Sequence, residues 1–315
     1  AQNDPLTSSG PIRKTRIGTD HHQPTKQDGG AAGKSWACQK SIESVAMPSN
    51  LTTPVVLIEQ RGNALWLTIN REERRNALNL DVIKGLHAGI EQAAAASDVR
   101  AVVLTGAGRK AFCAGADLSK GTDVFSPEGL DEPTTDFGRL ARRVRELGIP
   151  LVARINGACV AGGMGLMSLC DLAIAAESAR FGLPEVKVGV FPMQVLVYLR
   201  RLIGPRLVNE MCLTGELISA ARAYEIGLAN EVVPDDQLDA RIEALLARLA
   251  AASPVAVRRG KAVIAAMEEL AFHDALSLAE AQIAIASRTA DAREGLAAFN
   301  EKRKPRWASA EEKAS

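Results

Sequence analysis

The segment from Leu151 to Glu185 is the part of the chain that most constrains its fold. It begins with the apolar run Leu151–Ile155, continues through a glycine-rich turn and a run of small residues, and returns to apolar residues before a Pro-Glu turn. Short apolar runs bounded by turn residues predict buried strands, and the small residues between them predict a helix. Strand, helix and strand in this order predict an α/β core.

Glycines gather where this predicted helix begins, at Gly162, Gly163 and Gly165. Because glycine has no Cβ, a ligand can approach the backbone closely there. The first amides of a helix have no intrahelical partner and lie at the positive end of its dipole, so they can stabilise an oxyanion. Glu185 follows in the turn that closes the segment. An oxyanion cradle with one carboxylate predicts acid–base chemistry beside an activated carbonyl.

A second segment has the same character. The apolar run Ala101–Leu104 is followed by small residues in TGAGRKAFCAGADL, which ends at Leu118. Two such loops can each supply one backbone N–H to a single oxygen. The pair AFCAGADL and INGACVAGGMGLMSLCDLAIAAESARFGLPE resembles the enoyl-CoA hydratase/isomerase, or crotonase, superfamily. The likeness extends from about Val55 to Trp307 and includes NREERRNALN and EGLAAFNEKRKPRW.

The resemblance implies an α/β fold, with a crotonase-like core of repeated ββα units arranged as a spiral and a helical C-terminal region. We expect the core over residues 51–200 and the helical region over 201–308, followed by a tail at 309–315. In the superfamily, such a helical region takes part in trimer packing and covers the acyl-CoA site. The resemblance therefore also implies a homotrimer or a dimer of trimers.

Local patterns predict several elements without the resemblance. A Gly-Asn pair between two apolar runs predicts a hairpin of strands at 55–60 and 64–70. Asn79 is a candidate N-cap for a helix over 79–96. After Met193 the chain is predicted to be almost entirely helical, with helix starts marked by Pro205, Pro234 and Pro254.

The resemblance implies an acyl-CoA enzyme with three catalytic groups. The amides of Ala116 and Gly162 would form the oxyanion hole that binds the thioester oxygen as it becomes an enolate, and Glu185 would be the general acid and base. Removing one oxyanion-hole donor typically costs about 10²–10³ in rate. A carboxyl group in a largely apolar pocket has a raised pKa, which suits proton transfer near neutral pH.

Contacts with the substrate follow from the same resemblance. Coenzyme A carries phosphates, so cationic contacts are expected at Arg75 and, from the C-terminal region, at Lys302; ordinary solvated charges are the alternative for both. We expect Asp117 to fix the turn beside Ala116 rather than to act as a base. The expected substrate-binding residues are Arg75, Ala77, Ala114, Asp117, Leu118, Gly163, Gly165 and Lys302.

One position departs from the superfamily pattern. Standard enoyl-CoA hydratases carry a second glutamate where this chain has Gly165. Two carboxylates normally hold one water, so the change favours a Δ3,Δ2-enoyl-CoA isomerase that uses Glu185 alone. Overall resemblance favours a hydratase that adds water to a 2-enoyl-CoA, and a non-catalytic acyl-CoA-binding relative is a third interpretation. Other superfamily members supply a carboxylate from elsewhere, and the candidates in or beside the loop after the first oxyanion turn are Asp123, Glu128, Asp131, Glu132 and Asp136, each more readily explained as a solvated charge.

Composition argues against other classes of protein. Lys and Arg number 38 and Asp and Glu 37, so the net charge of +1 gives no electrostatic case for a nucleic-acid or membrane partner. The five cysteines form no CxxC pair, which favours reduced thiols in a cytoplasmic compartment and gives no metal site. We expect no cofactor other than the coenzyme A of the substrate.

Residues 1–50 differ in character from the rest of the chain. They are polar, rich in Gly, Pro, Ser and Thr, and have no hydrophobic period. This pattern predicts a disordered or vector-derived leader, with Met47 as a candidate native start. A mitochondrial presequence is the alternative, and the acidic residues Asp4, Asp20 and Asp28 argue against it.

Overall fold

The computed structural model describes residues 53–119, 121 and 134–309. The predictions for the leader at 1–50 lie outside the described residues, as do those for the tail after residue 309. Four of the five loop carboxylates considered as a second acid also lie outside them: Asp123, Glu128, Asp131 and Glu132.

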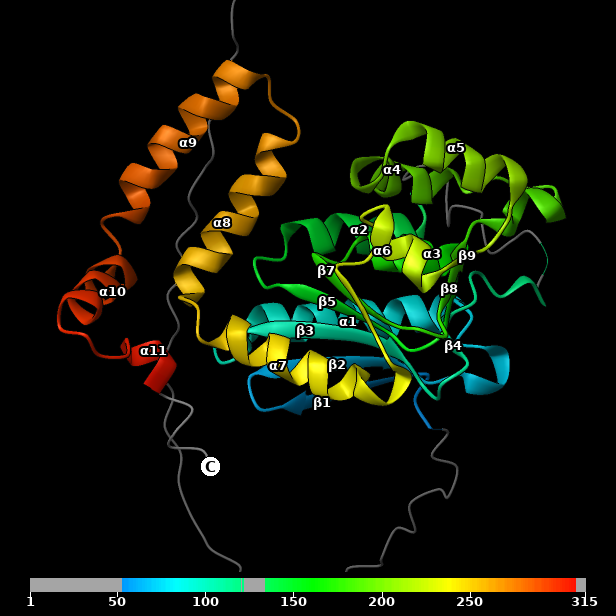
Figure 1. The fold of residues 1–315 in the computed structure, drawn as a ribbon, viewed down its shortest axis with the longest axis horizontal. Coiled ribbons are helices and arrows are strands. Elements are labelled where there is room, and N and C mark those ends of the chain that lie inside the picture. The colour runs from blue at the N-terminus through cyan, green and yellow to red at the C-terminus, as the bar shows by residue number, and fades with distance from the viewer. Residues whose placement is uncertain (1–52, 120, 122–133, 310–315) are drawn as a thin grey trace, which may run out of the picture. The chain divides into compact units, whose positions relative to one another are not determined.

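Six strands form the larger sheet, in the order β1-β2-β3-β5-β7-β10 (Figure 1). β1 and β2 form the predicted antiparallel hairpin, and every later neighbouring pair is parallel. Parallel strands that are covered on both faces need continuous apolar runs, and β3 is buried along its whole length. The strands are β1 Val56–Arg61, β2 Ala64–Ile69, β3 Ala101–Gly106, β5 Leu151–Ile155, β7 Leu172–Ala176 and β10 Glu231–Val233.

Four short strands form a second sheet, in the order β4-β6-β8-β9. They are β4 Ala111–Cys113, β6 Ala158–Val160, β8 Arg180–Gly182 and β9 Ile218–Ser219. Three times the chain runs from a strand of the larger sheet to one of the smaller sheet and then into a helical segment. These segments are α2 Asp136–Glu146, α3 Gly162–Ser168 and the 3₁₀ helix η3 Pro184–Val188. The repeated ββα arrangement confirms the predicted core.

Local signals explain where several helices begin. The Asn79 side chain accepts a hydrogen bond from Val82 N at 2.9 Å and so caps α1. Pro205 and Pro254 occupy the start of α5 and α8, where the missing N–H of proline is not needed. The other helices are η1 Glu72–Arg74, α1 Leu80–Ala95, α4 Met193–Leu202, α5 Pro205–Thr214, α6 Ala220–Glu225, η4 Asp235–Gln237, α7 Leu238–Ala250, α8 Pro254–Met267, α9 Phe272–Ala286, α10 Ala290–Asn300 and α11 Arg306–Ser309.

The prediction that the chain becomes almost entirely helical after Met193 is wrong in two places. β9 pairs with β8, with Ile218 opposite Phe181, and β10 pairs with β7, with Val232 opposite Ala175. Strands of two and three residues are too short to show a period of their own. α7 also packs on the larger sheet. The core therefore continues past the predicted boundary at residue 200.

The helices that follow α7 are packed differently. No described side chain of α8 or α9 is buried, and α9 exposes large apolar side chains at Phe272, Leu276 and Ile283. One link to the core is an ion pair in which Lys261 Nζ of α8 donates to Asp171 Oδ2 at 2.6 Å. This attachment of α8 is made by charged groups, whereas the elements of the core are held together by apolar packing.

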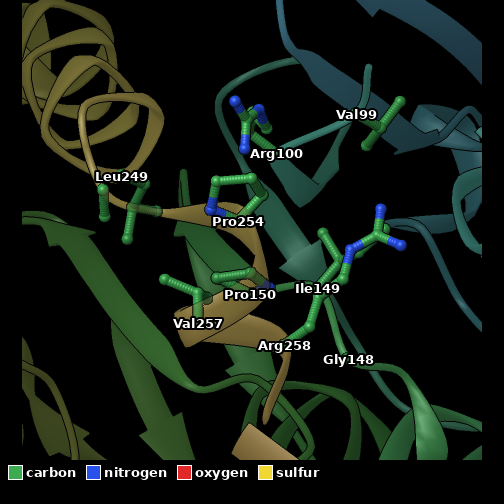
Figure 2. A pocket seen from close by; sticks show the side chains of 10 residues that line it. Val99, Arg100, Gly148, Ile149, Pro150, Leu249, Pro254, Val257 and Arg258 are labelled. Atoms are coloured by element: carbon green, nitrogen blue, oxygen red, sulfur yellow. The ribbon is translucent and has the colours of Figure 1, made fainter. Parts of the chain in front are cut away.

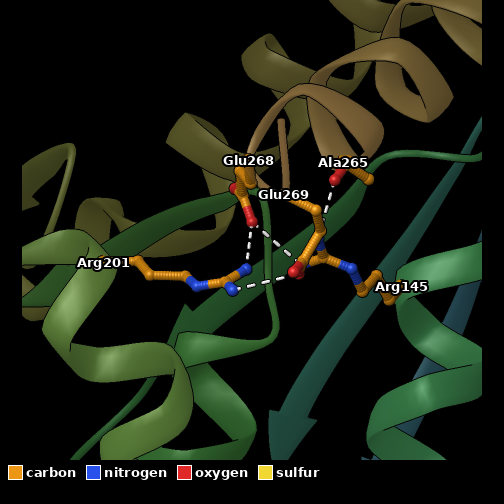
Figure 3. Close-up of polar contacts among 5 residues, drawn as sticks. All are labelled: Arg145, Arg201, Ala265, Glu268 and Glu269. Carbon is orange, nitrogen blue, oxygen red and sulfur yellow. Dashed lines mark hydrogen bonds and ion pairs between the residues drawn. The ribbon is translucent and has the colours of Figure 1, made fainter. Parts of the chain in front are cut away.

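A cluster of charged groups joins the end of α8 to α2 and α4 (Figure 3). Glu268 accepts hydrogen bonds from Arg145 at 2.8 Å and from Arg201. Glu269 accepts from the same two arginines at 3.0 and 3.1 Å. Arg145 Nη2 also donates to the carbonyl of Ala265 at 2.6 Å. This charge cluster ties three helices together at their ends.

Candidate active site

Two loops, one after β4 and one after β6, lie against each other. A Cβ placed on Gly162 would lie 3.5 Å from Gly115 Cα and 3.6 Å from Ala116 N. The amides of Ala116 and Gly162 donate to no acceptor among the residues that the structure describes. Two free backbone donors therefore lie on adjoining segments, which is the arrangement that an oxyanion site needs.

The first loop is held by the segment that precedes α1. Leu78 N donates to Gly115 O, and Asp117 N donates to Leu78 O, both at 2.7 Å. Arg71 Nη2 donates to Asp117 Oδ2 at 2.8 Å, and the two side chains are only 13% and 14% exposed. Hydrogen bonds from Ser119 and Arg71 hold the pKa of Asp117 well below its usual range. Asp117 therefore stays ionised, which makes it a poor proton carrier.

Two buried asparagines that sequence reasoning did not single out organise the same region. Asn76 Nδ2 donates to Ala111 O at 2.7 Å. Asn156 Nδ2 donates to the carbonyls of Gly106 at 2.8 Å and Gly108 at 2.7 Å. Ala111 and Gly106 are buried, so without these donors their carbonyls would lose a partner away from water, which is costly; Gly108 is exposed. The available signal for Asn156 was a polar residue placed directly after an apolar strand.

The second loop has a strained backbone just before α3. Ala161 has φ 51° and ψ −122°, a conformation that favours glycine. Ala161 N donates to Gly182 O at 3.0 Å, which joins this loop to β8. A Cβ on Gly163 would come within 2.2 Å of Cys113 O. The glycine there is needed for the approach of a neighbouring strand, in addition to the approach of a ligand that the sequence predicts.

Glu185 lies in η3 directly after Pro184, whose fixed φ begins the turn. Its side chain is half-buried, and the enclosed Oε2 atom has no hydrogen-bond partner among the described residues. Burial raises the pKa of this carboxyl group. Burial, together with the nearby charge of Glu185, raises the pKa of Cys212 on α5 to about 11, so that thiol stays neutral. The partly desolvated carboxyl group is a candidate proton carrier.

Gly165 faces apolar side chains. It lies three residues after Gly162, so the two glycines share one face of α3. A Cβ on Gly165 would come within 2.9 Å of Phe137 Cζ and 3.2 Å of Val195 Cγ2. A glutamate at this position has no space unless the ring of Phe137 moves.

The model of the family named Enoyl-CoA hydratase/isomerase matches residues 59–310. The chain belongs to this family. The short-chain-enoyl-CoA hydratase of Clostridium acetobutylicum is 35% identical over 254 residues, which are 79% of this chain and 95% of that protein. The 2,3-dehydroadipyl-CoA hydratase of Escherichia coli is 33% identical over 254 residues, which are 79% of this chain and 97% of that protein.

A solved structure leads to the same family. The enoyl-CoA hydratase of Mycobacterium smegmatis matches with a TM-score of 0.76 and 35% identity, and the match covers 81% of this chain and 99% of that one. The predicted crotonase-like α/β fold with a helical C-terminal region is therefore confirmed. The relatives support an acyl-CoA enzyme of the hydratase type. Their names include different acyl groups, so family membership does not identify the acyl group of the substrate.

The remaining residues predicted from the family resemblance are spread over two parts of the chain. Arg75, Ala77 and Ala114 belong to the first loop and its support: Ala114 N donates to Arg75 O at 3.1 Å, and Ala77 is buried. Leu118 is 48% exposed beside that loop. Lys302 is exposed just after α10, and within the described residues no hydrogen bond or ion pair links it to another predicted site residue.

The described residues offer little support for a second acid, a thiol nucleophile or a metal ion at the two candidate catalytic loops. Asp136, the loop carboxylate that is described, forms an ion pair with Arg139. Burial raises the pKa of Cys113 to about 12, so this thiol is no nucleophile. Within the described ranges, no group of three or more His, Cys, Asp or Glu could hold a metal ion. A search of those residues also finds no helix with the length and apolar character that crossing a membrane requires.

Two hollows near the start of β3 contain none of the predicted site residues. The smaller, of about 10 Å³, lies where the start of β3, the segment before β5 and the α7–α8 linker meet (Figure 2). The larger, of about 320 Å³, lies between the β1–β2 turn and α7. Arg100 lines both, and its enclosed Nη1 atom has no partner among the described residues.

Proposed function

We propose that the protein adds water to a 2-enoyl thioester of coenzyme A, with Glu185 as general acid and base. The observation that carries the proposal is the pair of free amides on adjoining loops, at Ala116 and Gly162. Donors placed where negative charge develops are each worth about 10²–10³ in rate. The two relatives are named as hydratases of acyl-CoA thioesters, which supports the same reaction.

In the proposed reaction, the thioester oxygen accepts hydrogen bonds from the two amides. The Glu185 carboxylate takes a proton from water, and the resulting hydroxide bonds to C3 while the C2–C3 π electrons move to the thioester oxygen as an enolate. The Glu185 carboxyl group then returns its proton to C2 as the carbonyl re-forms. The product has gained one water, and Glu185 is ionised again. A raised pKa suits both transfers because it lies nearer to neutral pH.

A second candidate is isomerisation of a 3-enoyl thioester, which is favoured by the apolar surroundings of Gly165. Here Glu185 takes a proton from C2, and the electrons move through the enolate as the double bond shifts to C2–C3. The same carboxyl group then returns the proton to C4. The mass does not change, and no second carboxylate is needed. A non-catalytic acyl-CoA-binding protein, the third candidate, would use the amides but leave Glu185 without a role.

The proposal includes binding and assembly. Arg75 would contact the nucleotide of coenzyme A from the first loop, and Lys302 would do so from the C-terminal region. A homotrimer or a dimer of trimers would cover the apolar side chains that α9 exposes, since large exposed apolar patches mark protein interfaces. The described cysteines are free thiols, which supports a cytoplasmic compartment. The reaction needs no cofactor beyond the coenzyme A of the substrate.

The test uses purified protein with 2-enoyl- and 3-enoyl-CoA substrates of equal chain length, and the products are weighed by mass spectrometry. A gain of one water on the 2-enoyl substrate supports hydration, and conversion of the 3-enoyl substrate without a mass change supports isomerisation. Glu185→Gln should lower turnover by about 10²–10⁴ while leaving CoA binding, measured by calorimetry, unchanged. Glu243→Gln, an exposed position on α7, is the matched control. Binding without turnover in the unmodified protein would reject both reactions.

A further inference from the structure

We propose that Phe137 is the specificity-determining residue of this site. Its ring, together with Val195, forms an apolar wall over Gly165 that limits water addition at C3 and favours acyl groups that are aliphatic and uncharged at C3 and C4. This inference rests on the proposed function, because it concerns the acyl group bound beside the two free amides.

The ring of Phe137 packs against Gly165, one turn along α3 from the free amide of Gly162. The free amide of Gly162 is in the first turn of α3, and Gly165 is on the same face one turn later. At 1.5 Å of rise per residue, the two positions are about 4.5 Å apart along the helix. Phe137 Cζ lies within 2.9 Å of where a Cβ on Gly165 would be. In the proposal, a thioester whose oxygen binds the amides has its C2–C4 segment beside this wall.

Phe137 lies on the apolar stripe of α2. Leu140, Ala141 and Val144 are the buried residues of α2, and Phe137 precedes them at helical spacing on the same stripe. The three are buried in the core, whereas Phe137 is only partly buried. The stripe thus extends one residue beyond the closed core and leaves part of an aromatic ring uncovered beside α3.

Contacts at both ends of α2 and α4 hold the two helices that form the wall. Gln194 Nε2, from the start of α4, donates to Thr135 Oγ1 at 2.6 Å, and the same oxygen accepts from Gly138 N at 3.0 Å to cap α2. At the other ends of these helices, the charge cluster of Figure 3 holds Arg145 of α2 and Arg201 of α4. Because α2 and α4 are fixed to each other, Phe137 and Val195 stay together over Gly165.

The chemical consequence concerns water. Carbon atoms cannot hold a water by hydrogen bonds, so this wall supplies no second group to polarise the attacking oxygen. Among the described residues, hydration then depends on Glu185 alone, while proton return to carbon is unaffected. A charged group on C3 or C4 would be desolvated against the ring without a partner, which is unfavourable. The wall therefore acts on the balance between hydration and isomerisation as well as on the choice of acyl group.

The main experiment replaces the wall by a carboxylate. Phe137→Ala/Gly165→Glu should hydrate the 2-enoyl substrate at least about tenfold faster than the unmodified protein, because a second general acid–base group is worth about 10²–10⁴ when well placed. Phe137→Ala alone should raise hydration relative to isomerisation, because it removes the ring that covers Gly165. Phe299→Ala, 81% exposed on α10, is the control for loss of a phenyl ring. Unchanged hydration in both Phe137→Ala and the double variant would overturn the proposal.

A stability measurement tests the geometry independently of catalysis. Gly165→Ala should lower the melting temperature of the unmodified protein, since its new Cβ meets the ring, and should lower it less in the Phe137→Ala background. Equal losses in the two backgrounds would overturn the contact on which the inference stands. If the unmodified protein converts neither substrate, the proposed function fails whatever this cycle gives. If it does turn over and Phe137 variants leave its products unchanged, the inference alone fails.

Discussion

The sheet core and the α8–α9 pair are held by different kinds of contact. In the core, β3 is buried along all six residues, and Gly163 lets one backbone approach another so closely that a Cβ would not fit. In the pair, no described side chain is buried, and ion pairs such as Lys261 with Asp171 make the attachment. The two candidate catalytic loops belong to the tightly packed part. Equal chemical changes should therefore have unequal effects in the two regions.

The largest contrast is expected from adding one methyl group. Gly163→Ala places a Cβ against Cys113 O and should destabilise the fold by on the order of 3 kcal/mol. Gly260→Ala, in α8, meets nothing within 4 Å and should stabilise by about 0.5–1 kcal/mol because alanine favours helix. Urea unfolding of both variants measures the difference. Similar values would mean that the close approach at Gly163 relaxes at little cost.

Removing an amide side chain should give the next effect. Asn156→Ala leaves the carbonyls of Gly106 and Gly108 without their donor and should cost about 2 kcal/mol. Asn300→Ala, at the exposed end of α10, should change stability by less than about 0.5 kcal/mol. Thermal unfolding compares the two. Turnover should also fall in Asn156→Ala alone, since this side chain positions the segment before β4.

Two glutamates should respond to pH in opposite directions. Burial raises the pKa of Glu185 above its value in the unfolded chain, so the stability that this group contributes is lost as pH rises through the folded-state pKa. The stability of Glu185→Gln relative to the unmodified protein should therefore increase with rising pH. Arg303 lowers the pKa of Glu294, whose contribution is present above the unfolded value and lost as pH falls through the folded one. The stability of Glu294→Gln relative to the unmodified protein should therefore decrease with rising pH. Melting temperatures at about pH 4 and about pH 8 measure both trends, and slopes of the same sign would contradict the assignment.

The smallest effect is expected at the charge cluster. Glu268→Gln removes the negative charge shared by Arg145 and Arg201, whose side chains are about one-third exposed, and should cost about 0.2–1 kcal/mol. The loss should disappear in about 1 M salt, where exposed charges are screened. Glu243→Gln is the unpaired control. A cost that persists in high salt would show that packing, rather than charge, holds α8 to α2 and α4.

Elements with strong local signals were predictable from the sequence. The Gly-Asn turn between β1 and β2, the Asn79 cap and the prolines that begin α5 and α8 each act within a few residues. β10 could not be found in this way because its three residues become a strand only through pairing with β7. Because such a short strand has no local signal, the core was predicted to end at residue 200, before β10.

The candidate site was predictable only in part for the same reason. The resemblance pointed to Ala116, Gly162 and Glu185, and their roles stay predictions until turnover is measured. Phe137 carried no signal, because its contact with Gly165 joins segments that only the packing of α2 on α3 brings together. Gly165 itself was noticed as a missing carboxylate, but the sequence did not tell what occupies the space.

The backbone of Ala161 has a consequence for evolution under heat. Its positive φ, combined with ψ −122°, costs an L-residue on the order of 1–3 kcal/mol, which Ala161→Gly would remove from the folded state. The added freedom of glycine in the unfolded chain takes back part of that gain. The same change would let the neighbouring Gly162 amide turn away from the first loop. Selection for heat resistance would thus favour glycine at position 161, which gives a more stable but slower enzyme. Selection for turnover would keep the strained alanine.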